Sequence, residues 1–215
     1  MLKGLEEDVL VLEGKAKIYE FFANIFAKEP DIEFLKLLQL KDNEEIFKSH
    51  GFAPLSDIKH LSLEQQAESL AIEYARLFLA PNRLAAPHES LQSGEGRLWG
   101  KSTVEVSQIC KKFGFALDEK FKDTPDHLCV ELSFLAQLTQ LEGKYITSEL
   151  TEEQEGVLEV KKYFLTNHIL KWFSRFKDEV NQNAELLYYK EIVNLLGTIL
   201  DEEYENLRNV EDLLL

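Results

Sequence analysis

The chain has 215 residues and a formal charge of −15 at pH 7, because 39 Asp and Glu outnumber 24 Lys and Arg. Apolar residues make up 45% and charged residues 29%, which is globular composition, and 10 Gly with 5 Pro argue against collagen-like and turn-rich all-β chains. Affinity for DNA and RNA comes mainly from Lys and Arg that neutralise phosphates, so this acid surplus argues against a nucleic-acid partner. A cationic peptide is easier to accommodate, although surplus acid also serves solubility by itself.

The N-terminal sequence carries no sign of export. Three acids lie in the first eight residues, whereas a secretory signal needs a basic start and an apolar run. No apolar stretch approaches the ~20 residues of a membrane span, so we expect a cytoplasmic protein without stable membrane insertion. Cys110 and Cys129 stand apart with no C-x-x-C spacing, which predicts two reduced, buried thiols rather than a disulfide framework.

Helical periodicity dominates the chain, and strand-type alternation is nowhere sustained. Apolar residues recur at spacings of three and four along 62–79, 128–138 and 165–180. We therefore predict an all-α fold, a single-domain bundle of about nine or ten helices over residues 1–215. The helices are expected, in chain order, near 5–28, 31–40, 42–49, 62–79, 87–92, 102–112, 125–142, 152–165, 168–180 and 183–208.

Several helix starts carry a local signal. The capping-box spacing, in which side chain and backbone satisfy each other's unpaired groups, occurs at Asp42/Glu45, Ser62/Gln65, Ser102/Glu105 and Thr151/Gln154. Thr124-Pro125 is another start, with Thr as N-cap and Pro at the first helical position, which makes His127 the third residue of its helix. The longest irregular segment is expected between Pro81 and Gly100, and long loops in compact domains are often functional.

The sequence lacks the common catalytic motifs. It has no G-x-x-x-x-G-K-[ST], G-x-G-x-x-G, G-x-S-x-G or H-E-x-x-H, and no Glu precedes any of the five His by three residues. Phosphate loops, nucleophile elbows, zinc-protease helices and di-iron bundles are therefore unsupported. We expect a protein that is not an enzyme, with no catalytic residues, no cofactor and no metal.

Two polar segments stand out and leave two interpretations open. On a helix, His127 and Glu131 are four residues apart and share a face, so with Asp126 they place two carboxylates and an imidazole at the opening of one polar site. Such a site suits guanidinium or amide groups. The other interpretation makes Asp126 a partner of the helix dipole and His127 a neutral packed side chain. Pro87-His88-Glu89-Ser90 is likewise either the start of a short helix or the polar wall of a groove.

An ordered set of short motifs runs from residue 73 to residue 172. Its members are Glu73-Tyr74-x-x-Leu77-Phe78, Pro87-x-Glu89-Ser90, Leu98-x-Gly100, Gly114-Phe115, Pro125-Asp126-His127-Leu128 with Glu131-Leu132, and His168-x-x-x-Trp172. In this order and spacing the set resembles the TorD/DmsD family of redox-enzyme maturation chaperones. The chain departs from that family at His88, Gln92 and Cys110, where members often have Tyr.

The resemblance implies an all-helical cytoplasmic chaperone without enzymatic activity. Its partner would be the twin-arginine signal peptide, and sometimes the body, of a molybdopterin-dependent oxidoreductase precursor, held until the molybdenum cofactor is inserted and the precursor is exported. Some members bind GTP weakly, and domain-swapped dimers occur, so the resemblance implies weak GTP binding and either a monomer or a swapped dimer. The alternatives are a nucleotide-binding helical switch that uses Asp126, His127 and Glu131, and a regulatory assembly protein.

A twin-arginine signal presents two guanidinium groups followed by an apolar stretch, so its receptor needs hydrogen-bond acceptors beside a hydrophobic trough. We expect Asp126, Glu89 and Glu131 to be the acceptors, with His127 and Ser90 beside them. Hydrogen bonds to charged groups contribute roughly 1.5–3 kcal/mol each, and a net of about −8 kcal/mol corresponds to about micromolar affinity. The trough is expected from the apolar side chains Leu77, Phe78, Leu91, Trp99 and Leu128.

Overall fold

The computed structural model describes residues 2–79, 83–117 and 121–214, and within these ranges every regular element is a helix. The helices are α1 (Leu2–Ala27), α2 (Ile32–Leu38), α3 (Lys41–Ser49), α4 (Leu63–Tyr74), α5 (Glu89–Gln92), α6 (Lys101–Lys112), α7 (Leu128–Thr147), α8 (Thr151–Phe164), α9 (Leu170–Asn183) and α10 (Leu187–Leu214), with π-helical turns η1 (Ala75–Leu79) and η2 (Leu165–Ile169). The all-α prediction is confirmed. No helix in the described ranges combines the length and the apolar character needed to cross a membrane.

The chain divides into two compact units. The first unit contains Met1–Ala27, His88–Trp172 and Glu202–Leu215, and the second contains Lys28–Pro87 and Phe173–Asp201. Helices α9 and α10 each contribute residues to both units. That residues 1–215 form one domain stays a prediction.

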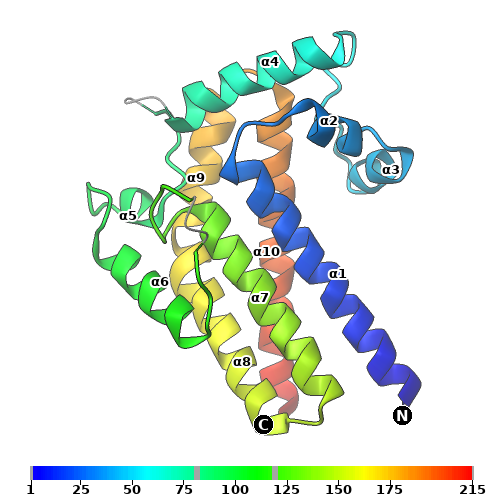
Figure 1. Ribbon diagram of the computed structural model, residues 1–215, viewed down its shortest axis with the longest axis vertical. Helices are drawn as coiled ribbons and strands as arrows, with labels where there is room; N and C mark the ends of the chain where they lie inside the picture. The colour runs from blue at the N-terminus through cyan, green and yellow to red at the C-terminus, as the bar shows by residue number, and fades with distance from the viewer. Residues whose placement is uncertain (1, 80–82, 118–120, 215) are drawn as a thin grey trace. The chain divides into compact units, whose positions relative to one another are not determined.

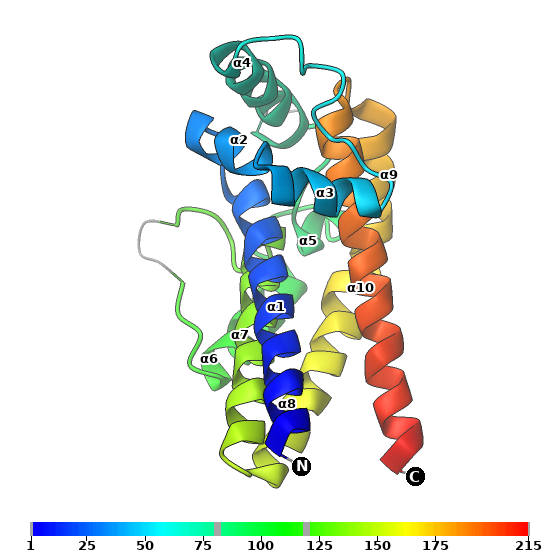
Figure 2. The ribbon, with the colours of Figure 1, turned by 90° about the vertical axis from the view of Figure 1, so that its right-hand side faces the viewer.

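In the first unit, α1, α7 and α8 lie side by side along most of their lengths (Figures 1 and 2). Aromatic contacts hold α7 in place, since the ring of Phe134 packs edge-on against Phe164 of α8 at 4.8 Å between centroids. A buried charge cluster joins three helices, because Lys161 of α8 contacts the carboxylates of Glu142 on α7 and Glu203 on α10. The unit therefore combines an apolar core with one enclosed ionic network.

In the second unit, aromatic packing and one buried carboxylate order the helices. The Phe78 ring lies 5.1 Å from Tyr74 and 5.2 Å from Tyr189, both edge-on. The Glu73 carboxylate accepts hydrogen bonds from the backbone N–H groups of Glu185 and Leu186, just before α10 begins. Glu73 therefore supplies the acceptor that unpaired N–H groups at a helix start require.

The predicted helix boundaries are partly correct. The Ser62/Gln65 capping box at the start of α4 is confirmed, with both of its hydrogen bonds present. The boxes expected at Asp42, Ser102 and Thr151 are wrong, because the N-caps there are Leu40, Gly100 and Leu150. At α6 the reason is a side chain from outside the helix. The Glu95 carboxylate accepts from the N–H groups of Lys101 and Ser102, so a local cap is not needed.

Two further expectations concern irregular segments. The gap predicted between the helices near 152–165 and 168–180 is wrong, because the π-helical turn η2 joins α8 to α9 without interruption. A π turn is wider than an α-helical turn, so the helix can continue where the spacing of its apolar residues changes. The irregular segment before Gly100 is confirmed for 83–100, where α5 is the sole helix. Residues 81 and 82 of that segment lie outside the described residues.

Candidate functional site

The motif segments around Glu89 and Asp126 meet in the first unit. His88 and His127 form an isolated antiparallel β-bridge, and the backbone N–H of Glu89 donates to the carbonyl of Asp126 at 3.0 Å. The N–H of Ser90 donates to Oδ2 of Asp126 at 2.8 Å. The structure therefore brings together four of the predicted site residues from segments about forty residues apart.

His127 lies outside the helix that it was predicted to enter. It is the N-cap of α7, with extended backbone dihedrals, and its Nδ1 accepts a hydrogen bond from the N–H of Cys129 at 3.1 Å. The expected start at Thr124-Pro125 is wrong because residues 125 and 126 form a turn and the β-bridge holds His127 in an extended conformation, so α7 begins at Leu128. An Nδ1 that accepts a hydrogen bond carries no proton, so the imidazole of His127 is neutral in this arrangement.

Asp126 is a buried carboxylate with internal donors. Burial would raise the pKa of Asp126, but the nearby hydroxyls of Ser90, Thr124 and Thr103 and the hydrogen bond from the Ser90 N–H hold it below its ordinary value. The side chain is fully buried. Asp126 therefore stays charged inside the protein, where it fixes the start of α5.

Glu89 and Glu131 each face an aromatic nitrogen from the run that joins η2 to α9. Nδ1 of His168 lies 2.8 Å from Oε2 of Glu89, and the indole N–H of Trp172 donates to Oε2 of Glu131 at 3.2 Å. Burial raises the pKa of Glu131 well above its ordinary value, and the nearby charges of Glu89 and Asp126 raise it further. Glu131 therefore keeps its proton to higher pH than an exposed glutamate does.

A second polar cluster lies on the other side of the β-bridge. Nε2 of His88 lies 2.8 Å from Oδ1 of Asp123, and the rings of His88 and His127 are 4.8 Å apart. Burial would raise the pKa of Asp123, but the hydrogen bond and charge of His88 lower it to about 2. Asp123 had not been singled out in the sequence, because nothing in Lys122-Asp123-Thr124 distinguishes it from an ordinary loop acid.

The five apolar side chains expected in the trough differ in exposure. Leu128 is buried in the first unit, and Leu77 and Phe78 are buried in the second. Leu91 is half-buried. Trp99, in contrast, is 66% exposed and adopts a left-handed backbone conformation with φ of 60°. Among these five, Trp99 presents the largest apolar surface to a partner, and such strained residues cluster at functional sites.

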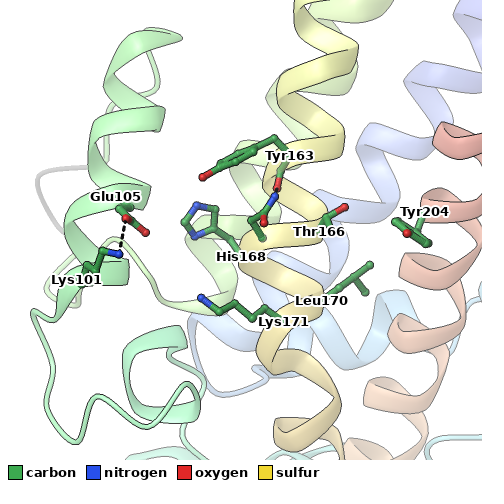
Figure 3. A pocket seen from close by; sticks show the side chains of 9 residues that line it. Lys101, Glu105, Tyr163, Thr166, His168, Leu170, Lys171 and Tyr204 are labelled. Carbon is green, nitrogen blue, oxygen red and sulfur yellow. Dashed lines mark hydrogen bonds and ion pairs between the residues drawn. The ribbon is translucent and has the colours of Figure 1, made fainter. Parts of the chain in front are cut away.

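A cavity of about 500 Å³ lies beside this region, within the first unit. Figure 3 shows α6 with Lys101 and Glu105 on one side, opposite His168 and Lys171 on the run from η2 into α9. Nε2 of His168 is buried and has no hydrogen-bond partner among the described residues, while its Nδ1 faces Glu89. The wall of the cavity is thus joined by one hydrogen-bonded pair to the carboxylate cluster. The remaining lining residues are Tyr163, Thr166, Asn167, Leu170 and Tyr204.

The lining lysines and the pairing of Glu89 with His168 were not predicted. Glu89 and His168 are 79 residues apart, and no local pattern joins them. His168 and Trp172 are one helical turn apart, a spacing that by itself favours packing of both side chains in the core. Both side chains are indeed buried, and each also contacts a carboxylate of the cluster.

The described residues form an all-helical fold with a buried polar cluster between two motif segments, and the curated relatives that match this chain are named as chaperone proteins. The family described as "Nitrate reductase delta subunit" matches residues 50–178. The chain therefore belongs to this family.

Individual relatives agree over most of the chain. The chain is 28% identical over 198 residues to the chaperone protein TorD of Vibrio parahaemolyticus, covering 86% of this chain and 90% of that protein. It is 26% identical over 212 residues to the TorD of Photobacterium profundum, covering 89% and 93%. A crystal structure of a putative redox enzyme maturation protein from Archaeoglobus fulgidus matches 85% of this chain and 93% of its own length, with a TM-score of 0.51 and 22% identity, which supports the fold.

Proposed function

We propose that this chain is a cytoplasmic chaperone that binds the twin-arginine signal peptide of a molybdopterin-dependent oxidoreductase precursor and holds it until cofactor insertion and export. Relatives named as TorD chaperones match over most of the chain, and a structural neighbour is titled a redox enzyme maturation protein. The acidic balance of −15 fits a partner that carries guanidinium groups.

The observation that carries the proposal is the meeting of the two motif segments at a cluster of three carboxylates. Glu89, Asp126 and Glu131 each retain one buried carboxylate oxygen with no fixed donor among the described residues. A guanidinium offers five N–H donors in a planar fork that matches a carboxylate. Charge-assisted hydrogen bonds of this kind are about twice as strong as neutral ones.

Since these carboxylates are buried, binding requires the α5 segment to open. α5 has four residues, and Ser90 reaches Asp126 through one backbone hydrogen bond. A guanidinium that replaces this donor would keep the carboxylate satisfied while α5 moves. We propose that Asp126 and Glu89 accept from the arginines, that Glu131 lies behind them, and that His127 and Ser90 frame the opening.

For the apolar stretch of the signal we propose contact with Trp99 and Leu91. Trp99 is mostly exposed and Leu91 half-buried, so both can reach a peptide with little rearrangement. Leu128, which follows His127 as the first residue of α7, is buried. Leu77 and Phe78 are buried in the second unit. We propose that they contact the peptide only after client binding has exposed the core of that unit.

The test is a calorimetric titration with a synthetic twin-arginine leader and with the same leader carrying Lys-Lys. We expect about micromolar affinity for the arginine leader, at least tenfold weaker binding of the lysine leader, and weaker binding at high salt. Asp126→Asn keeps the shape and most hydrogen bonds of the residue while removing its charge, and it should weaken the arginine leader selectively. Equal and salt-independent affinity for both leaders would contradict the proposal. Undiminished capture of the mature client without its leader would favour the regulatory assembly protein.

A second candidate function, weak GTP binding, is favoured by the cavity beside His168. Its volume of about 500 Å³ and its lysines Lys101 and Lys171 suit a phosphorylated ligand, although Lys101 is also paired with Glu105 at 3.5 Å. Lys171→Glu should abolish binding of a fluorescent GTP analogue, and Lys111→Glu, which changes an exposed lysine of α6 outside the cavity, is the matched control. Equal binding by the two variants would remove this candidate.

A further inference from the structure

The pair of histidines at the β-bridge forms a second polar centre, separate from the carboxylate cluster. His88 is the N-cap of α5 and His127 is the N-cap of α7, so each lies at the start of a helix. The bridge between their backbones fixes the distance between the two helix starts. Their rings lie 4.8 Å apart and nearly perpendicular, at 87°.

Asp123 completes the centre with an oxygen. Nε2 of His88 lies 2.8 Å from its Oδ1, and one ligand-type atom from each of the three residues falls within 4.8 Å of the others. Around a tetrahedral zinc ion with bonds of about 2.0–2.2 Å, ligand atoms are about 3.4 Å apart. The spacing of 2.8 Å lies below this value and no pair is more than 4.8 Å apart, so small side-chain rotations can bring the three atoms into coordination geometry.

Hydrogen bonds already orient two of the three groups. Nδ1 of His127 accepts from the N–H of Cys129, which directs Nε2 of the same ring away from α7. Oδ1 of Asp123 accepts from the N–H of Thr124 at 2.8 Å. Partners of this kind, outside the ligands themselves, typically change metal affinity by a factor of about 10–100.

The buried ring of His88 lies with Nε2 at the Asp123 carboxylate and has no second hydrogen-bond partner within the described ranges. Its Nδ1 is buried without a hydrogen-bond partner among the described residues. In the metal-free protein Nε2 of His88 donates to the Asp123 carboxylate, and because Nδ1 has no competing partner in the described part of the chain, the ring can carry its proton on Nδ1 when Nε2 coordinates a metal. Asp123 is 38% exposed, which gives an ion a path from solvent and leaves room for a water as fourth ligand.

We propose that His88, Asp123 and His127 bind one divalent transition-metal ion of the zinc class, which cross-links the starts of α5 and α7. Two imidazole nitrogens and one carboxylate oxygen are ligands that Zn²⁺, Co²⁺ and Ni²⁺ accept, whereas Mg²⁺ and Ca²⁺ prefer oxygen ligands throughout. The proposal differs from the sequence-based expectation of no metal, and it holds whether or not the chain binds a signal peptide.

The test is equilibrium dialysis of the untagged, full-length chain against Zn²⁺, followed by elemental analysis. We expect one equivalent in the unmodified protein and at least a tenfold loss of affinity in His88→Gln and in Asp123→Asn. His60→Gln, which removes an exposed histidine of the second unit, is the matched control and should bind as the unmodified protein does. Co²⁺ serves as a spectroscopic probe, because a four-coordinate site gives intense d–d absorption that should disappear in both cluster variants.

Folding of each variant is checked by circular dichroism and thermal denaturation. His88 is buried and its variant can unfold, whereas the side chain of Asp123 is partly exposed, so Asp123→Asn keeps the test decisive. Zn²⁺ should also raise the melting temperature of the unmodified protein and not that of Asp123→Asn. The proposal is overturned if the unmodified protein binds no Zn²⁺ in the micromolar range, or if folded Asp123→Asn binds as tightly as His60→Gln.

Discussion

Trp172 donates its indole N–H to Oε2 of Glu131 at 3.2 Å, and solvent reaches neither side chain. The two residues are 41 positions apart, on α9 and α7. The contact gives a buried carboxyl one fixed donor, and the raised pKa of Glu131 favours its protonated form. Protonation at this position reduces the repulsion among the three acids that converge there.

The first prediction concerns the pH dependence of stability at Glu131. Its folded pKa lies well above the ordinary value of 4.5, chiefly because of burial, so the folded state holds a proton that the unfolded state releases. The contribution of Glu131 is full below about pH 4.5 and is lost as pH rises through the folded pKa. As pH rises, the unmodified protein should lose up to about 1.4 kcal/mol of its free energy of unfolding per pH unit through Glu131. Glu131→Gln, whose amide resembles the neutral acid, should not show this loss.

The free energy of unfolding of the unmodified protein and of Glu131→Gln is measured by urea titration from about pH 4.5, the ordinary pKa of Glu, to about pH 8. Glu159→Gln, an exposed acid on α8, is the matched control and should follow the unmodified protein. Parallel curves for Glu131→Gln and the unmodified protein would mean that Glu131 is ionised in the folded state.

The second prediction concerns Trp172 as a core residue. Trp172→Ala should lower the free energy of unfolding by about 3–5 kcal/mol, because it leaves a large cavity and removes the donor to Glu131. Trp172→Phe keeps most of the volume and loses the hydrogen bond, so its cost should be clearly smaller. Denaturant titration measures both values. Equal losses would indicate that the indole N–H, rather than the ring volume, stabilises the site.

The third prediction concerns the ionic network of the first unit. Lys161 contacts Glu142 at 3.0 Å and also Glu203, and all three are buried. Lys161→Met leaves Glu142 without its cation and Glu203 with Lys15 alone, which should cost about 3–5 kcal/mol at pH 7. Lys36→Met, which breaks the exposed pair with Glu33, should change stability little.

The fourth prediction concerns the loss of stability of the same network at low pH. Burial would raise the pKa of Glu203, but the charges of Lys161 and Lys15 lower it overall. Its contribution is therefore present above about pH 4.5 and is lost as pH falls through the folded pKa, opposite in sign to Glu131. Glu203→Gln should be destabilised at pH 7 and should lose less stability than the unmodified protein on acidification. A constant difference between the two proteins down to about pH 3 would contradict this assignment.

The sequence predicts most helices because their signals are local. The apolar stripe and capping box of 62–79 give the start of α4 and its continuation through η1. Thr124-Pro125 misplaces the start of α7, because the backbone pairing of Glu89 with Asp126 overrides a favourable N-cap sequence. The helix near 102–112 is predicted to within one residue, but its capping box at Ser102 is absent because Glu95 caps α6 from outside the helix. Errors thus occur where a distant or neighbouring segment supplies the hydrogen bond.

The candidate site was predictable as a set of residues and not as a set of contacts. Motif order indicated Glu89, Ser90, Asp126 and His127, and the structure brings these four together. Burial of the carboxylates was not predictable, because each acid is stabilised inside by a donor from elsewhere, such as Ser90 for Asp126. Periodicity reports which face of a helix is apolar and carries no information on which polar group meets a buried acid.

The last prediction separates the side chain of Trp99 from its backbone. Trp99 is 66% exposed, so its removal costs little core packing, and its φ of 60° is a conformation that glycine adopts without strain. Trp99→Ala and Trp99→Gly should both weaken the twin-arginine leader several-fold, and Trp99→Gly should be at least as stable as Trp99→Ala. Leu10→Ala, an equally exposed apolar residue on α1, is the control and should bind the leader normally. Calorimetry gives the affinities and thermal denaturation gives the stabilities. If Trp99→Ala binds the leader as tightly as Leu10→Ala does, the apolar stretch of the signal lies elsewhere on the chain.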